Sequence, residues 1–283
     1  MADIDAVSAD GTRIAVHDLG GTGAPLVFVH GAGLHGHVFV PLATALRDDF
    51  HCFAVDLRGH GASGVSTPLD FEWIRLAEDV AAAVDAIGAS APFAVVHSAG
   101  GNATLRAEAH SPGTFSAIYC YEPVMHTPEI PLDITETHPI VEQALRRKTW
   151  FSSREEAFER YRARPPFDTV TDEALWAYID FGFHAADDGG IEIACKPEYE
   201  VAVYLAGMRS DLYDVADRIR CPVAVAVGIT PTNALGPVLA RACAERIDGA
   251  ELVGFEGLGH LGPMEDPPRV AASIIDTFVT ARA

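Results

Sequence analysis

The sequence predicts an α/β fold in which a mostly parallel sheet carries helices on both faces and a helical cap is inserted into the core. Three observations support this prediction: short apolar runs alternate with helical patterns, the alternation stops for one long stretch, and it then resumes. Continuous apolar runs are typical of parallel strands that are buried on both faces. We expect residues 1–123 and 215–283 to form the core, and residues 124–214 to form the cap.

The elements of the core follow one another in a regular order. Residues 71–87 carry apolar side chains at helical spacing, and this pattern stops at Gly88, a common helix-ending residue. The apolar runs are bounded by glycine, proline and polar residues, as buried strands are. Strands are expected at residues 12–17, 25–29, 51–55, 92–97, 115–121, 222–227 and 251–255, and helices at residues 71–87, 99–110, 233–247 and 268–281.

The inserted stretch, residues 124–214, is mostly helical in pattern and is the most aromatic part of the chain. Ser153 and Glu156 have the spacing of a capping box at the start of one of its helices. An aromatic insertion after the carboxyl end of a strand is where a lid over a pocket would lie. Trp150 and Trp176 are therefore its candidate substrate-binding side chains.

The net charge limits the classes of partner. Forty acidic residues against 20 basic ones give a net charge of −20. A surface this negative repels nucleic acid and anionic lipid, so we expect a small-molecule substrate, with no nucleic acid and no membrane as partner. The charge weakly favours a neutral or cationic substrate, and a homodimer stays open.

Cysteine spacing and apolar content indicate the compartment. The five cysteines are odd in number and include no C-x-x-C pair, so neither a disulfide framework nor a zinc site is expected. Residues 1–5 are acidic and lack the apolar segment of a signal peptide. The longest apolar runs are far shorter than a membrane span. These features predict a cytoplasmic protein.

One serine lies where a strand passes directly into a helix. The segment from Val95 to Gly101 reads Val-Val-His-Ser-Ala-Gly-Gly, with Ser98 at the junction. A serine on such a sharp turn sits in a strained conformation, and its hydroxyl is exposed above the sheet. The helix that starts at Ala99 presents free N–H groups to a developing oxyanion. Ser98 is therefore the candidate nucleophile.

These motifs resemble the α/β-hydrolase superfamily over nearly the whole chain. The matching parts are His30-Gly31 after one strand, residues 56–61 after the next, the turn at Ser98 and the loop from Gly257 to His260. The sequence departs from the superfamily's G-x-S-x-G turn because Val96 replaces the first glycine. The resemblance implies that His260 takes the serine proton and that the amides of Ala32 and Ala99 form the oxyanion hole.

The acid of the triad is absent from its familiar position. In the superfamily, the acid usually follows the strand that corresponds to residues 222–227. No Asp or Glu occurs here between Arg218 and Ala244. Glu122 follows the strand that succeeds the nucleophile helix, so it is the candidate replacement. Some haloalkane dehalogenases and the zearalenone-type lactonases are similar in this respect. Asp56 is the main competitor, and it resembles the superfamily's structural Asp that braces loops near the site.

The loop after the second expected strand carries further histidines. His30 is expected to brace this loop, together with Arg58, His60 and Ser63 of the neighbouring one. His35 lies a few residues beyond His30, where its side chain can face the pocket, and it is a candidate substrate-binding residue.

A Ser–His–acid triad with an oxyanion hole transfers an acyl group to water. We expect a serine hydrolase that cleaves a hydrophobic or aromatic carboxylic ester or a lactone, with no metal or organic cofactor. Three alternatives stay open: a carbon–carbon bond hydrolase, a cofactor-free dioxygenase of the same fold, and a non-catalytic ligand receptor. Ester turnover, oxygen uptake and the absence of both would separate hydrolase, dioxygenase and receptor.

Overall fold

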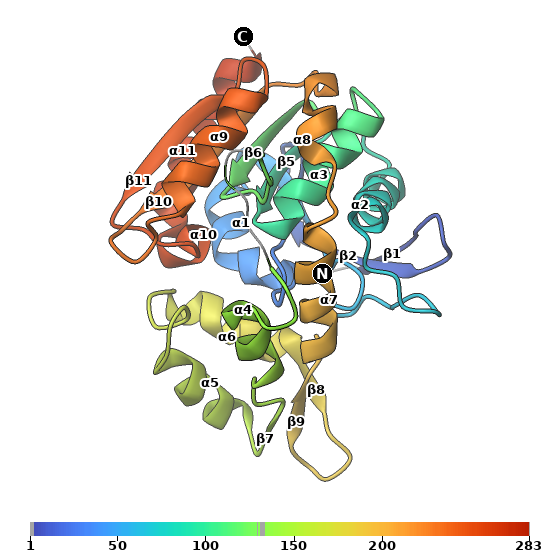
Figure 1. Ribbon diagram of the computed structural model, residues 1–283, viewed down its shortest axis with the longest axis vertical. Coiled ribbons are helices and arrows are strands. Elements are labelled where there is room, and N and C mark those ends of the chain that lie inside the picture. The colour runs from blue at the N-terminus through green and yellow to red at the C-terminus, as the bar shows by residue number, and fades with distance from the viewer. Residues whose placement is uncertain (1–2, 129, 131–133, 283) are drawn as a thin grey trace.

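The computed structural model describes residues 3–128, 130 and 134–282, and it is built around an eight-stranded sheet (Figure 1). The strands lie in the order β1-β2-β4-β3-β5-β6-β10-β11. The pairs β1–β2 and β2–β4 are antiparallel, and the other neighbours are parallel, which confirms the predicted sheet. The strands are β1 (Asp3–Val7), β2 (Arg13–Gly20), β3 (Ala24–Val29), β4 (Phe50–Val55), β5 (Phe93–His97), β6 (Ala117–Tyr121), β10 (Val223–Ile229) and β11 (Glu251–Glu256).

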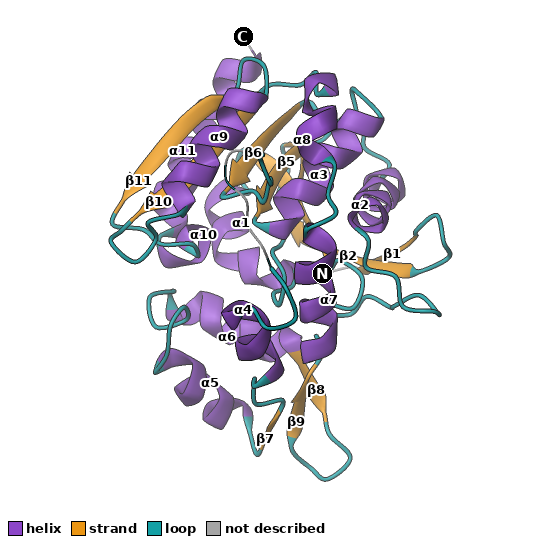
Figure 2. Cartoon of the chain, in the orientation of Figure 1, coloured by secondary structure: helices purple, strands orange, loops and turns teal. Residues whose placement is uncertain are grey.

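Both faces of the sheet are covered, and for this reason the strands appear in the sequence as continuous apolar runs. In β3, Val27 and Val29 pack into one core cluster, while Leu26 and Phe28 pack into another on the opposite face. Helices cover both faces of the sheet (Figure 2). The first cluster contains side chains of α2 (Trp73–Ile87), α3 (Ala99–His110) and α9 (Gly236–Arg246), and the second contains those of α1 (Val40–Leu46), α10 (Gly262–Glu265) and α11 (Pro267–Arg282).

The strand order reverses between β3 and β5. From β3 the chain moves to β4 on one side, and after α2 it returns to β5 on the other side. In sheets of this kind, ligands bind beyond the carboxyl ends of the strands where the order reverses. The loops after these two strands carry Gly31 and Ser98, so the topology brings the two loops together.

The segment inserted between β6 and β10 forms most of the lobe below the sheet in Figure 1. The helix α7 reaches back to the core, where the indole N–H of Trp73 donates to the carbonyl of Val203, 3.1 Å away. The boundary between cap and core stays a prediction. The elements of the segment are α4 (Pro139–Leu145), β7 (Trp150–Phe151), α5 (Arg154–Arg162), α6 (Asp172–Gly182), β8 (Phe183–Ala185), β9 (Ile191–Ile193), α7 (Pro197–Gly207) and α8 (Leu212–Val215).

Three local features differ from the sequence-based expectation. The inserted segment includes an antiparallel sheet in the order β7-β9-β8, whose strands are too short to give a periodic signal. Strand β1 was not predicted, and it forms a hairpin with β2 at the sheet edge. At α5, Ser153 caps the helix by accepting from the amide of Glu156, whereas the Glu156 carboxylate accepts from Ser152 instead of completing the box.

In the described part of the chain, no helix has the length and apolar character needed to cross a membrane.

Candidate active site

Ser98 lies on a sharp turn between β5 and α3. Its backbone has φ 52° and ψ −118°, which is uncommon for a residue with a side chain. Such strain persists only where the surrounding structure holds it, and it is frequent at functional sites. The Ser98 amide donates to the carbonyl of Tyr121, and the Ser98 carbonyl accepts from Val124, so β6 and the chain after it hold the turn from both sides.

Two glycines on the helix side make room for this turn. A Cβ at Gly100 would lie 2.5 Å from the carbonyl oxygens of Val29 and His30, at the end of β3. A Cβ at Gly101 would lie 2.7 Å from the Cβ of Pro123 and 3.7 Å from a methyl group of Val96. Gly101 therefore makes room for Pro123, while a side chain there would be in ordinary contact with Val96.

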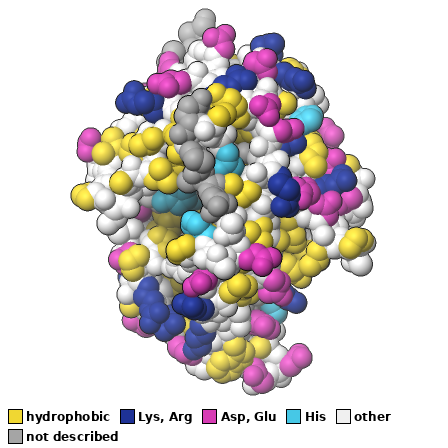
Figure 3. Space-filling model, in the orientation of Figure 1, with side chains coloured by type: hydrophobic (Ala, Val, Ile, Leu, Met, Phe, Trp, Pro, Cys, Tyr) yellow, Lys and Arg dark blue, Asp and Glu magenta, His cyan; other side chains and the backbone are white. Residues whose placement is uncertain are grey.

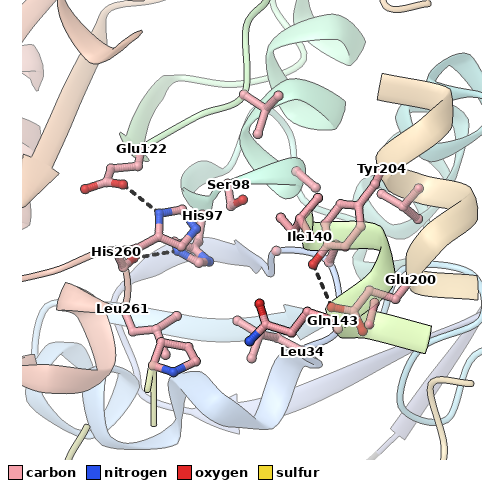
Figure 4. Close-up of a pocket in the computed structure, with 18 of the residues that line it drawn as sticks. Leu34, His97, Ser98, Glu122, Ile140, Gln143, Glu200, Tyr204, His260 and Leu261 are labelled. Atoms are coloured by element: carbon pink, nitrogen blue, oxygen red, sulfur yellow. Dashed lines mark hydrogen bonds and ion pairs between the residues drawn. The ribbon is translucent and has the colours of Figure 1, made fainter. Parts of the chain in front are cut away.

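The structure brings His260 and Glu122 into contact. His260 follows β11 in the loop that precedes α10, and its Nδ1 lies 2.6 Å from Oε2 of Glu122. Figure 4 shows the imidazole between the Glu122 carboxylate and the Ser98 side chain. The side chain of Glu122 is only 6% exposed, whereas that of His260 is 45% exposed and faces the cavity. Water therefore screens the carboxylate weakly, and its charge acts strongly on the imidazole.

Glu122 is held in a conformation that suits this contact. It follows β6 with φ 47°, and its amide donates to the carbonyl of Ala226 in the neighbouring strand β10. Its second oxygen, Oε1, accepts from the amide of Gly228 at 3.0 Å and from the side-chain amide of Asn233 at 2.6 Å. These two donors satisfy Oε1, so Oε2 faces Nδ1 of His260.

Asn233 lies in the loop after β10, where the superfamily usually carries its acid. Its Nδ2 contacts Glu122, and the same nitrogen donates to the carbonyl of Gly228 at 2.9 Å. Asn233 was not predicted, because only a carboxylate in this loop was expected to contact the histidine. An amide in the loop that lacks the usual acid is a signal that could have found it.

Three side chains fix the backbone of the His260 loop. The hydroxyl of Tyr121 donates to the carbonyl of Gly259 at 2.9 Å, and the carboxylate of Glu265 accepts from the Gly259 amide at 2.8 Å. The Nε2 of His97 lies 2.8 Å from the carbonyl of His260, which requires a proton on that nitrogen. His97 directly precedes Ser98, so this hydrogen bond connects the turn at Ser98 to the loop of His260 (Figure 4).

The amides expected to form an oxyanion hole both border the cavity. Ala99 is the first residue of α3, and Ala32 follows the close approach of Gly31 to Ser98, where a Cβ on Gly31 would lie 2.9 Å from that of Ser98. In the described residues, neither amide donates to another group of the protein. Two free N–H groups beside one hydroxyl can stabilise a negative oxygen between them.

Asp56, the competing acid, is occupied elsewhere. Its buried carboxylate accepts from Nε2 of His17 at 2.8 Å and from the amides of Gly36 and Ala62 at 2.7 and 2.8 Å. Burial alone would raise the pKa of Asp56, but the hydrogen bond and charge of His17 outweigh it and hold the pKa below its usual range. These contacts brace the loops after β3 and β4, as a structural aspartate would.

The other loop residues also have structural contacts. His30 accepts from the amide of Leu57, and His60 accepts from the amide of Gly33, so the two histidines join neighbouring loops. Arg58 is fully buried and forms an ion pair with Asp79 at 2.7 Å.

A cavity of about 840 Å³ opens in front of Ser98 and extends between the core and the cap. Its wall includes Ser98, His260 and Glu122 from the core, together with aromatic side chains. In the described part of the chain, no group of three or more His, Cys, Asp or Glu side chains is placed to hold a metal ion. The aromatic residues of the wall are Trp73, Phe151, Tyr161, Phe167 and Tyr204.

The three residues predicted to bind substrate do not line this cavity. Trp150 is 39% exposed and donates to Asp188 on the surface of the cap. Trp176 stacks on Phe158 with the ring centroids 4.4 Å apart. His35 is buried, and its Nε2 donates to the carbonyl of Tyr178, which connects the core loop to α6. The aromatic content of a segment does not show which side chains point inward.

Four buried histidines near Ser98 resist protonation. Burial lowers the pKa of His30 to about 3, and it also lowers the pKa values of His35, His60 and His97. The charge of His260 lowers the pKa of His97 further. In the unfolded chain these side chains protonate near pH 6.5, so the unfolded state takes up protons that the folded state does not.

We therefore expect the free energy of unfolding to fall as the pH drops below about 6.5. His30 alone accounts for about 1.4 kcal/mol at pH 5.5, and the other three act in the same direction. Denaturant unfolding at several pH values measures this slope. His97→Gln should reduce the slope by the equivalent of about one bound proton, whereas Ser111→Ala, which changes an exposed side chain that does not titrate, should leave the slope unchanged. Equal slopes for both variants and the parent protein would contradict the expectation.

The sequence of the chain is similar to those of known proteins. A model of the alpha/beta hydrolase family matches residues 26–273. A 2-(acetamidomethylene)succinate hydrolase of Mesorhizobium japonicum is 26% identical over 261 residues, which are 92% of this chain and 90% of the relative.

Solved structures are similar over the full length. The crystal structure of E-2-(acetamidomethylene)succinate hydrolase superposes with a TM-score of 0.80 at 21% identity, covering 98% of this chain and 99% of the other. An esterase from Rhodococcus sp. ECU1013 superposes with a TM-score of 0.74 at 22% identity, covering 99% of each chain. At this level of identity the two similarities establish the shared fold.

Proposed function

The chain belongs to the alpha/beta hydrolase family, and from that premise we propose that it is a serine hydrolase that cleaves a carboxylic ester or lactone through an acyl-enzyme. The observation that supports this most strongly is the contact of 2.6 Å between Nδ1 of His260 and Glu122, beside a serine at φ 52°. A carboxylate on Nδ1 leaves Nε2 without a proton, so that nitrogen can act as a base.

In the proposed reaction, Oγ of Ser98 attacks the carbonyl carbon of the ester while Nε2 of His260 takes the hydroxyl proton. Glu122 stabilises the resulting imidazolium and stays ionised. The amides of Ala32 and Ala99 donate to the oxyanion, and the dipole of α3 adds to their effect. His260 then gives its proton to the departing alcohol. A water molecule repeats the sequence on the acyl-enzyme and releases the acid.

A lactone requires the same steps, because it is a cyclic ester whose alcohol stays attached to the acyl group. The cavity wall offers apolar surface for either kind of substrate, with Leu34, Ile140 and Leu261 among its members. Figure 4 shows these three side chains around the space in front of Ser98. Contact with this wall would bind the apolar part of a substrate and orient its carbonyl group.

Amide hydrolysis is a second candidate activity. The relative that aligns over 92% of this chain is named for a substrate with an acetamido group. The proposed triad can perform this reaction too, since His260 would protonate the departing nitrogen as it protonates an alcohol.

A panel of esters, lactones and amides, assayed for acid release with parallel measurement of oxygen uptake, tests the proposal. We expect acid release without oxygen uptake. Oxygen uptake with a heteroaromatic substrate would support a cofactor-free dioxygenase instead. Tight binding of a ligand without turnover would support a receptor, and cleavage of a vinylogous diketone in preference to every ester would support a carbon–carbon bond hydrolase.

A further inference from the structure

The cavity has a charge balance opposite to that of the chain. The whole protein carries 40 acidic and 20 basic residues, yet among the described residues that line the cavity five are basic and three are glutamates. A cleft with one dominant sign of charge raises the local concentration of oppositely charged ligands. The five basic residues all belong to the cap, and Figure 3 shows Lys and Arg side chains gathered over that lobe. They are Arg146, Arg147, Lys148, Arg160 and Arg164.

Each of the three glutamates already has a partner. Glu122 contacts His260, Glu142 accepts from Arg146 at 3.1 Å, and Glu200 accepts from Arg147 at 2.8 Å.

Two of the arginines are left without a carboxylate. Lys148 pairs with Glu156 outside the cavity. In the described part of the chain, Arg160 and Arg164 form no ion pair with a carboxylate, and both are exposed at the rim. No carboxylate among the described residues therefore neutralises their positive charge.

Arg147 occupies the inner part of this wall. Its side chain is 20% exposed, and its Nη2 contacts Glu200, whose own side chain is 3% exposed. Glu200 also accepts from the hydroxyl of Tyr204 at 2.6 Å. The remaining nitrogen, Nη1, is buried and has no hydrogen-bond acceptor. A buried donor without an acceptor is unfavourable, so an acceptor brought to this wall would be stabilised there.

Tyr161 provides a second donor on the same wall. Its ring lines the cavity, and its buried hydroxyl lies beside the phenol of Tyr178, with no carboxylate or carbonyl acceptor among the described residues. Burial raises the pKa of Tyr161, and the nearby charge of Arg147 opposes this only in part, so the phenol keeps its proton at neutral pH. A guanidinium and a phenol together match the two oxygens of a carboxylate.

This wall is close to the site of bond cleavage. Glu200 packs against Gly33, where an added Cβ would lie 2.8 Å from its Oε1. Gly33 directly follows Ala32, whose amide is proposed to hold the oxyanion. Arg147 is thus connected through Glu200 to the loop beside Ser98, and one small molecule can span both places within the cavity.

We propose that the cap wall is a subsite for a carboxylate of the substrate, which Arg147 and Tyr161 bind and which Arg160 and Arg164 attract at the rim. The inference rests on the proposed function for the position of the cleaved bond. It narrows the substrate to an ester or amide that also carries a free carboxylate. It replaces the weak preference for neutral or cationic substrates that the net charge suggested.

Isothermal calorimetry with succinate tests the subsite without any turnover. We expect succinate to bind and the variant Arg147→Met/Glu200→Gln to weaken binding about 10- to 100-fold, as for the loss of a charged hydrogen bond. The double change avoids leaving the Glu200 carboxylate buried without its partner. Tyr161→Phe removes one hydroxyl and should weaken binding several-fold with little change in Tm. Arg154→Met removes a cap arginine that pairs with Asp180 outside the cavity, so binding should stay the same.

Turnover provides the second test. Monomethyl succinate and methyl butanoate differ mainly in the free carboxylate, and we expect kcat/KM to favour the first by at least about 10-fold. The Arg147→Met/Glu200→Gln variant should lose this preference. If no ester, lactone or amide is cleaved but succinate binds in an Arg147-dependent way, the subsite stands and the proposed function fails.

Three results would overturn the subsite. The first is no binding of succinate, and the second is equal binding by the double variant and the parent protein. The third is binding of inorganic phosphate as tight as that of succinate, which would show a general anion site.

Discussion

Ser98→Ala is expected to lower kcat for ester hydrolysis by at least about 10³-fold, because the variant has no nucleophile and keeps only the cavity and the oxyanion amides. The fold should be preserved. The residue at this turn has φ 52°, and alanine meets the same backbone strain there as serine does. Steady-state kinetics on the preferred ester, with Tm measured in parallel, separate the loss of chemistry from a loss of structure.

Ser111→Ala is the matched control, because Ser111 is exposed at the opposite end of α3. It should leave kcat unchanged. Hydrolysis by Ser98→Ala at the rate of the parent protein would exclude the acyl-enzyme and would favour chemistry that uses His260 and Glu122 alone, such as proton abstraction in a cofactor-free dioxygenase.

Glu122→Gln should lower kcat by up to about 10⁴-fold with little change in stability. The amide oxygen can still accept from Gly228 and Asn233, so the NH₂ group would face Nδ1 of His260. An N–H donor at that position favours the tautomer with its proton on Nε2, and this tautomer cannot take the proton of Ser98. Kinetics and thermal unfolding of the variant measure both effects.

Asp56→Asn is the control for Glu122→Gln, because it changes the other buried carboxylate that follows a strand of the core. It removes the charge of a carboxylate that accepts hydrogen bonds from His17 and from two backbone amides. We expect it to reduce Tm at least as much as it reduces kcat. If Glu122→Gln kept a normal rate and Asp56→Asn lost it without unfolding, the acid would be assigned to Asp56.

Much of the sheet could be predicted because its strands are buried on both faces. Such strands require apolar side chains at every position, and the run Leu26–Val29 shows this in the sequence. The edge strand Asp3–Val7 could not be recognised in this way, since Asp3 and Asp5 interrupt its apolar residues and Asp5 and Val7 are exposed. The contact of Glu122 with His260 was predicted from two observations. No carboxylate occurs between Arg218 and Ala244, and Glu122 follows the neighbouring strand.

The rest of the site depends on side-chain directions that no pattern encodes. Asn233 and Glu122 follow the neighbouring strands β10 and β6, and their contact depends on how the loop after β10 folds. Arg147 and Tyr161 line the cavity, while Trp150 and Trp176 do not. All four belong to the same cap segment, and their periodicity does not separate the inner from the outer face because helices and short strands alternate there.

The most direct test of the central claim is covalent labelling with a fluorophosphonate, followed by peptide mapping by mass spectrometry. The account predicts one adduct, on Ser98, with no labelling of Ser98→Ala and much slower labelling of Glu122→Gln, because the activated hydroxyl attacks phosphorus as it would attack a carbonyl carbon. An adduct on another residue, or an ester-cleaving protein that the reagent leaves unlabelled and fully active, would contradict the assignment of Ser98 as the nucleophile.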